Sequence, residues 1–191
     1  MSQSGLSLMF QPLAKYFEFE GRARRSEYWL WVLFLVLANA ALTAVQFSFI
    51  GRNSINIGMG VIVVIKILFG LGMIIPTFSV SVRRMHDSNR TGWWTILPTT
   101  VFFISAIVYF SLNGVAFMGE MENMRNLSET SENPTAIAAA VMTIMRPLIW
   151  ILVPTMLAKL VTFVFRVLDG TPGPNRFGPD PKGRGGNANI F

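Results

Sequence analysis

The single histidine of the chain, His86, stands directly before Asp87. An imidazole that a carboxylate orients can act as a general base. Side chains of adjacent residues often diverge, however, so hydrogen bonding within a turn is the simpler interpretation. The chain has no cysteine, which excludes a thiolate nucleophile and a Cys-ligated metal. No spacing of His, Asp and Glu resembles a metal site. The sequence therefore predicts no catalytic residue, no metal and no cofactor.

Arginines concentrate in three short polar segments, residues 19–29, 83–94 and 169–181, which we call the cap. Guanidinium groups match the oxygens of phosphate, so an anion such as a lipid headgroup is the expected ligand. The candidate binding residues are Arg22, Arg25, Arg83, Arg84, Arg90 and Arg176. The candidate structural partners that hold them are Glu27, His86, Asp87, Asn175 and Asp180. The alternative is a cluster of ion pairs that satisfies itself and only touches anionic lipid.

Four long apolar stretches connect these segments, at about residues 28–50, 58–82, 93–112 and 142–168. Each has about the twenty residues that a helix needs to cross a bilayer. The chain is 52% hydrophobic and only 14% charged, whereas soluble domains carry about 25% charged residues. The predicted fold is all-α, a polytopic membrane protein with four transmembrane helices.

Basic residues alternate with the spans. They are frequent before the first span, between the second and third, and after the fourth, and they are rare in the other two connections. The positive-inside rule therefore predicts that the N- and C-termini are both cytoplasmic. The formal net charge is +6. The basic residues lie next to the predicted membrane ends, where they set the orientation of the protein and attract anionic lipid headgroups. Membrane lipids are the expected partners, and nucleic acid is not.

The predicted organisation is one integral-membrane domain, residues 1–181, followed by a flexible cytoplasmic tail at 182–191. Residues 113–135 are polar and acidic, and we expect an exposed outer loop there. The apolar stretch from residue 136 to 168 is too long for one crossing. A break at Arg146–Pro147 would leave 136–145 as an outer interfacial helix, and a single long, kinked helix is the alternative.

Lys66 lies near the middle of the second span. A charge inside the membrane is a functional hypothesis by default. It could line a watery cavity, bind an anion or contact backbone carbonyls. No Asp or Glu lies within a predicted span, which counts against a carrier that couples to protons or cations through buried carboxylates.

Three motifs occur in order along the chain. The first, GRxxRxEYW-like, comprises Gly21, Arg22, Arg25, Glu27, Tyr28 and Trp29. The second is RRxHDxxRxGWW, residues 83–94, and the third is NRFGPDP, residues 175–181. Together they resemble the bacterial inner-membrane family labelled domain of unknown function 805, over about residues 17–181. The resemblance implies a small multi-pass protein of the bacterial inner membrane and implies no activity.

These observations favour a non-enzymatic membrane protein whose cap binds anionic lipid or a partner protein. A small transporter or channel for an anionic or small polar solute is the alternative. That alternative requires a homo-oligomer, because four helices with short loops enclose only a narrow pore. An enzyme acting on lipid phosphates is a third class, with only His86, Asp87 and Asp180 as candidates for its chemistry.

Overall fold

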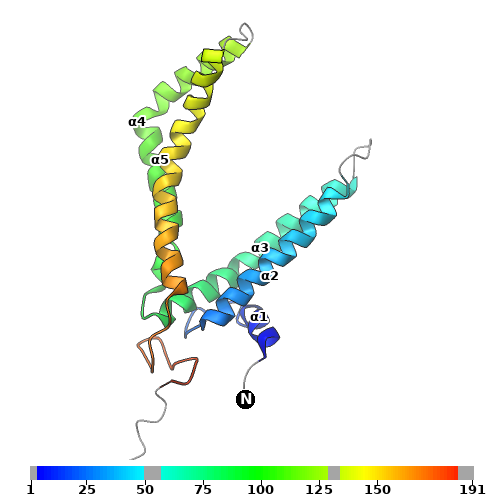
Figure 1. The fold of residues 1–191 in the computed structure, drawn as a ribbon, viewed down its shortest axis with the longest axis vertical. Coiled ribbons are helices and arrows are strands. Elements are labelled where there is room, and N and C mark those ends of the chain that lie inside the picture. Colours follow the sequence, from blue (N-terminus) through cyan, green and yellow to red (C-terminus); the bar gives the residue numbers. More distant parts are fainter. Residues whose placement is uncertain (1–3, 50–56, 129–133, 185–191) are drawn as a thin grey trace, which may run out of the picture. The chain divides into compact units, whose positions relative to one another are not determined.

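The computed structural model describes residues 4–49, 57–128 and 134–184, and the described chain is helical throughout (Figure 1). The elements are α1 (Gly5–Ala14), α2 (Arg25–Phe47), α3 (Ile57–Asp87), the 3-10 helix η1 (Gly92–Thr95), α4 (Leu97–Ser128) and α5 (Pro134–Val167). Within these described ranges no extended strand occurs. The chain divides into two compact units, residues 1–95 with 165–191, and residues 96–164.

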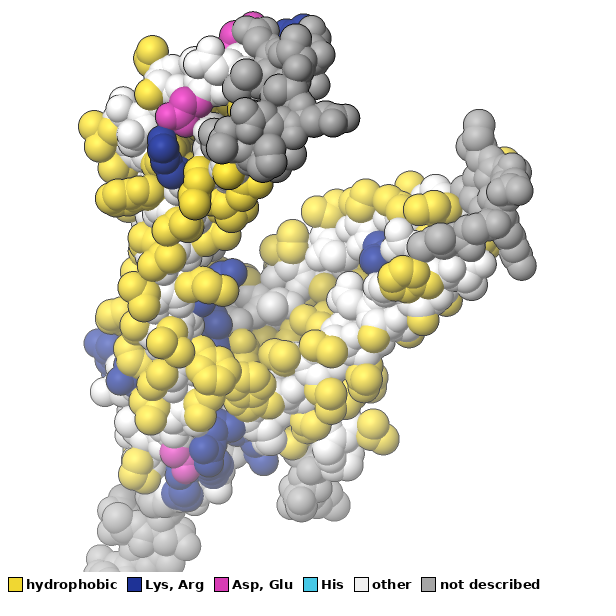
Figure 2. All heavy atoms as spheres, turned by 45° about the horizontal axis from the view of Figure 1, so that its top comes forward, with side chains coloured by type: hydrophobic (Ala, Val, Ile, Leu, Met, Phe, Trp, Pro, Cys, Tyr) yellow, Lys and Arg dark blue, Asp and Glu magenta, His cyan; other side chains and the backbone are white. Residues whose placement is uncertain are grey.

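Four of the helices contain apolar segments long enough to cross a membrane. These segments are Arg25–Phe47, Ile57–Asp87, Leu97–Arg125 and Val141–Val167. The shortest has 23 residues, which at 1.5 Å per residue gives about 35 Å, enough for a hydrocarbon core of about 30 Å. Hydrophobic side chains cover the exposed helix surfaces (Figure 2). The predicted all-α class with four transmembrane helices is confirmed.

The first unit is built on the hairpin of α2 and α3. Its small core is formed by Ala23, Tyr28, Trp31 and Val80. The indole Nε1 of Trp31 donates to Thr77 Oγ1 at 3.1 Å, so the one polar atom of this buried ring is satisfied. The short helix α1, which the sequence pattern did not predict, packs on both long helices.

The second unit consists of α4 and most of α5, which lie side by side (Figure 1). Arg146 Nη1 of α5 and Glu120 Oε1 of α4 are 2.9 Å apart, but both side chains are largely exposed. Such an exposed pair adds little stability.

The acidic outer loop predicted at 113–135 is wrong for most of its length, because α4 continues to Ser128. Residues 113–128 contain no proline and several good helix formers, including Ala116, Met118 and Glu122. Polarity ends a membrane span, but it does not end a helix whose backbone hydrogen bonds are internal. Residues 129–133 of the predicted loop lie outside the described residues.

The predicted break at Arg146–Pro147 is also wrong, since α5 is continuous from Pro134 to Val167. It follows the alternative of one long helix. A proline removes one backbone donor and leaves the other hydrogen bonds of the helix in place, which membrane helices tolerate. Its 34 residues correspond to about 51 Å.

Two further boundaries affect the site. Helix α3 extends to Asp87, beyond the predicted end at 82, so the residues from Arg83 to Asp87 form its last turn. Lys182 and Arg184, assigned to the flexible tail, make ion pairs with Asp169. Residues 185–191 of that predicted tail lie outside the described residues.

Candidate functional site

The three cap segments meet in the first unit through backbone contacts. The amide of Ala23 donates to the carbonyl of Arg83 at 3.0 Å, and the amide of Thr171 donates to the carbonyl of Asp87 at 2.9 Å. The segment before α2 and the segment after α5 are therefore both joined to the last turn of α3, from which they are about 60 and 84 residues away in sequence. The end of α3 is therefore the central part of the cap, and the other two segments are hydrogen-bonded to it.

Asp87 occupies this centre and binds two arginines. Arg22 Nε donates to Asp87 Oδ1 at 3.0 Å, and Arg84 Nη1 donates to Asp87 Oδ2 at 2.5 Å. The side chains of Arg22, Arg84 and Asp87 are at most 2% exposed. Ions removed from water in this way are stable only when each one is paired and hydrogen-bonded. Asp87 thus binds two guanidinium groups at once, so the remaining donors of both groups need further acceptors.

Backbone carbonyls at the end of α5 and after it supply those acceptors. Arg22 donates to the carbonyls of Thr171 and Gly173, each at 2.6 Å. Arg84 donates to the carbonyls of Arg166 and Leu168. The two arginines therefore fix the C-terminal segment to α3, and their donors point at protein atoms.

Gly170 makes this close approach feasible. A Cβ atom built at Gly170 would overlap the carboxylate of Asp87. Only a residue without a side chain therefore allows the C-terminal segment to lie directly on the carboxylate.

A second buried ion pair joins α2 to α3. Arg83 Nη1 donates to Glu27 Oε1 at 2.7 Å, with side chains 1% and 4% exposed. Within the described chain, Arg83 Nε and Nη2 are buried with no hydrogen-bond partner. Leaving buried donors unpaired costs free energy, so this pair is less completely satisfied than the Asp87 cluster.

His86 and Asp87 do not form an acid–base pair, because their side chains bind different partners. His86 Nδ1 is 3.1 Å from the carbonyl of Gly21, so this nitrogen carries the proton. Its ring stacks on Phe177, with centroids 4.0 Å apart and planes 2° from parallel. His86 thereby anchors Phe177, and its hydrogen bond joins α3 to the segment before α2 rather than closing a turn.

Asn175 orders the C-terminal turn. Its Nδ2 donates to the carbonyl of His86 and to Thr171 Oγ1, both at 3.0 Å, and its Oδ1 accepts the amide of Phe177 at 2.9 Å. Gly178 has a φ of +134°, a conformation that glycine adopts without strain. The NRFGPDP motif is thus a turn that presents Phe177 to His86.

The other candidate cations lie further out. The side chain of Arg25 is 43% exposed and is 3.5 Å from Asp169. Arg90 lies over the ring of Phe165 at 4.0 Å, a cation–π contact. Arg176 is exposed, and its Nη2 donates to the carbonyl of Asn89 at 3.2 Å. Lys and Arg side chains gather around a small acidic patch on this part of the molecule (Figure 2).

The two carboxylates of the C-terminal segment are held in the ionised form. A hydrogen bond from Lys182, reinforced by its charge and that of Arg25, lowers the pKa of Asp169 to about 2. Burial would raise the pKa of Asp180, but hydrogen bonds from Arg184 and the Lys182 amide outweigh it and lower the pKa. Asp180 also lies 3.9 Å from Arg22.

Lys66 is not part of the cap. Its Nζ donates to Gln46 Oε1 at 2.9 Å and to Thr43 Oγ1 at 3.2 Å, both on α2. The charge is thus solvated by neutral oxygens of the neighbouring helix. Among the described residues, no group of three or more His, Asp or Glu side chains is arranged to hold a metal ion.

Sequence reasoning missed three contributors to this site. Arg166 and Gly170 lie on either side of the end of the fourth span, and Arg184 donates to Asp180 and to the carbonyl of Gly170. Gly170 follows Asp169 at the start of a Gly- and Pro-rich segment, which is a signal for a turn. No local pattern indicates that its partner is Asp87.

The chain is similar in sequence to a known protein family. Residues 16–179 match the model of a family described as "Protein of unknown function (DUF805)". The "Inner membrane protein YhaH" of Escherichia coli (strain K12) is 28% identical over 170 residues, covering 89% of this chain and 92% of that protein. The "Inner membrane protein YhaI" of the same organism is 29% identical over 106 residues, covering 54% and 82%. No solved structure matches the chain significantly.

Proposed function

The chain belongs to the DUF805 family and is a multi-pass inner-membrane protein, and we propose that it is a non-enzymatic scaffold whose cap engages anionic lipid headgroups. The cytoplasmic leaflet carries anionic lipids that attract basic residues close to membrane ends. The positive-inside rule assigns the cap to that leaflet.

One observation carries the proposal: the cap has an inner and an outer set of cations. The inner set, Arg22, Arg83 and Arg84, is buried and binds carboxylates or carbonyls of the protein itself. This set builds a fixed framework. The outer set remains accessible, as the exposure of Arg25 and Arg176 illustrates.

A fixed framework favours headgroup binding for a physical reason. Association loses free energy when flexible side chains become ordered. Arg176 is held by the Asn89 carbonyl and lies 4.7 Å from the ring of Phe177, which itself stacks on His86. An arginine that is already positioned loses less freedom when a phosphate binds.

The proposal can be tested with brominated lipids, which quench nearby tryptophan fluorescence. Trp29, Trp93 and Trp94 belong to the cap and serve as reporters. We expect brominated phosphatidylglycerol to quench more than brominated phosphatidylcholine. The double variant Arg25→Gln/Arg176→Gln should lose this preference, by roughly fivefold per arginine if each contributes about 1 kcal/mol.

The matched control is Arg125→Gln/Arg146→Gln, which removes two charges from the second unit. It should leave the preference at the cap tryptophans unchanged. An equal preference in the wild type and in the cap variant would contradict the proposal. Loss of a co-purifying protein without any change in lipid preference would point to a protein partner instead.

A further inference from the structure

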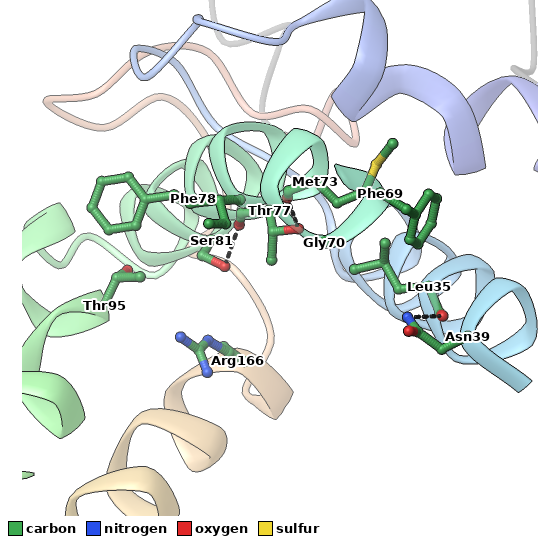
Figure 3. A pocket seen from close by; sticks show the side chains of 11 residues that line it. Leu35, Asn39, Phe69, Gly70, Met73, Thr77, Phe78, Ser81, Thr95 and Arg166 are labelled. Carbon is green, nitrogen blue, oxygen red and sulfur yellow. Dashed lines mark hydrogen bonds between the residues drawn. The ribbon is translucent and has the colours of Figure 1, made fainter. Parts of the chain in front are cut away.

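A pocket of about 460 Å³ lies in the first unit, between α2, the second half of α3, η1 and the end of α5 (Figure 3). It is separate from the outer cations of the cap. Its volume falls within the range of small-molecule pockets. The residues that line it divide into an apolar part and a polar part, and this division indicates the class of ligand.

The apolar part consists of side chains from two helices. Leu35 of α2 and Phe69, Met73 and Ile74 of α3 line it. The one polar side chain at this end is Asn39, which lies beside Leu35 and donates to its carbonyl at 2.9 Å (Figure 3). Ile74 is 58% exposed, so this part opens to the surroundings of the helices, which in a membrane are acyl chains. A water-soluble solute would gain nothing from such a wall.

The polar part lies nearer the end of α3 and carries one positive charge. It comprises Ser81, Thr77, Thr95 and Arg166. Thr77 and Ser81 donate to carbonyls of their own helix, those of Met73 and Thr77. No residue that lines the pocket is acidic, and Arg166 forms no ion pair within the described chain.

Two buried polar atoms on this part of the pocket lack partners. Among the described residues, neither Arg166 Nε nor Thr95 Oγ1 has a hydrogen-bond partner. The guanidinium carbon of Arg166 lies 5.6 Å from the centre of the Tyr28 ring. A buried donor without an acceptor is unfavourable, and the charge of Arg166, which no carboxylate of the described chain pairs, favours an anionic group at this end of the pocket.

The length of the pocket indicates a lipid rather than a free anion. From Phe69 to Ser81 along α3 is twelve residues, or about 18 Å. One leaflet of the hydrocarbon core is about 15 Å thick. A single acyl chain would therefore run along the apolar part, with its headgroup at the polar part.

We propose that this pocket binds one anionic phospholipid, with the phosphate at Arg166 and Thr95 and one acyl chain between α2 and α3. A free phosphate could meet the same two side chains, Arg166 and Thr95, without the acyl chain. Water-soluble glycerol phosphate is therefore a necessary comparison in the test.

Two neighbouring glycines of α3 allow a sharp experiment. Gly70 lines the pocket and Gly72 does not, and a Cβ atom at either position meets no neighbour within 4 Å. Gly70→Leu should fill the pocket without disturbing the helix. Gly72→Leu is the control with the same change in composition.

The measurement is native mass spectrometry of protein released from nanodiscs that contain equal phosphatidylglycerol and phosphatidylcholine. We expect one retained phosphatidylglycerol in the wild type and in Gly72→Leu. We expect at least a tenfold loss of this adduct in Gly70→Leu and in Arg166→Gln. The backbone contact of Arg166 with Arg84 does not involve the replaced side chain. Circular dichroism checks that each variant is folded.

Three results would overturn the inference: an adduct of equal abundance in Gly70→Leu and wild type, equal retention of phosphatidylcholine, or binding of glycerol phosphate unaffected by Gly70→Leu. If Arg166→Gln does not fold, Gly70→Leu and Arg166→Lys test the inference in its place. Lys keeps the charge, so Arg166→Lys should retain part of the phosphatidylglycerol adduct. Loss of the outer cations in Arg25→Gln/Arg176→Gln should leave this adduct in place, so the two proposals can fail separately.

Discussion

Asp87 is the residue on which most contacts of the cap converge. Its carboxylate binds Arg22 and Arg84, and its carbonyl accepts from the amide of Thr171. The last contact holds the C-terminal segment directly. A single residue, through its carboxylate and its backbone carbonyl, thus joins the segment before α2, the end of α3 and the segment after α5.

We expect Asp87→Asn to destabilise the protein by about 3–5 kcal/mol, because it leaves the buried guanidinium of Arg84 without the carboxylate that it binds and leaves Arg22 with Asp180 at 3.9 Å. Thermal unfolding in detergent measures the change. The matched control is Glu120→Gln, which removes one member of the exposed pair with Arg146 and should change stability by about 1 kcal/mol or less. Similar effects of the two substitutions would contradict the central role of Asp87.

At the scale of elements, the C-terminal segment is the part of the cap with the least regular structure. Its prolines prevent a helix, so it is held by contacts to other elements. Asp169 binds Lys182, and Asp180 binds Arg184. Both carboxylates must be ionised for these contacts to form.

The docking of this segment should therefore depend on pH. The pKa of Asp169 falls from its ordinary 3.8 to about 2 in the folded protein. A lowered pKa contributes stability that is complete above the unfolded value and is lost as the pH falls through the folded value. We expect the segment to loosen as the pH falls from about 4 to about 2.

The anisotropy of a fluorophore on Pro179→Cys can follow this loosening, because position 179 is exposed and the chain has no other cysteine. The anisotropy should fall over that pH range. In an Asp169→Asn background it should already be lower at pH 6, with a smaller acid transition. A constant anisotropy between pH 5 and pH 2 would show that these carboxylates do not hold the segment.

At the scale of the whole molecule, the distribution of charge predicts the orientation in the membrane. Cap residues should face the cytoplasm, and the far end of the hairpin formed by α4 and α5 should face the opposite side. This orientation is required for the cap to meet the anionic lipids of the cytoplasmic leaflet.

Cysteine labelling can test this orientation without a background signal, since the natural chain contains none. Ser26→Cys in the cap and Met121→Cys in α4 place thiols at exposed positions. A membrane-impermeant maleimide added to spheroplasts should label only Met121→Cys. Inverted membrane vesicles should reverse the pattern, and labelling of both positions from one side would refute the predicted topology.

The sequence alone determined the class, the family and the four membrane helices, because hydrophobic length is a local property of the chain. It also singled out the three segments that form the cap, but not Arg166, Gly170 or Arg184 as parts of the site. It did not predict that α4 continues to Ser128, because hydropathy marks where a membrane ends and not where a helix ends.

Only the tertiary structure decided which arginines lie inside. Arg83 and Arg84 are adjacent in an arginine-rich motif, as expected for surface cations, yet both are buried. Their burial depends on carboxylates and carbonyls from distant segments, such as Glu27 and Leu168. No local pattern specifies such partners, since desolvation of a charge is offset only after the chain has folded. The pocket at Arg166 depends on the same long-range packing.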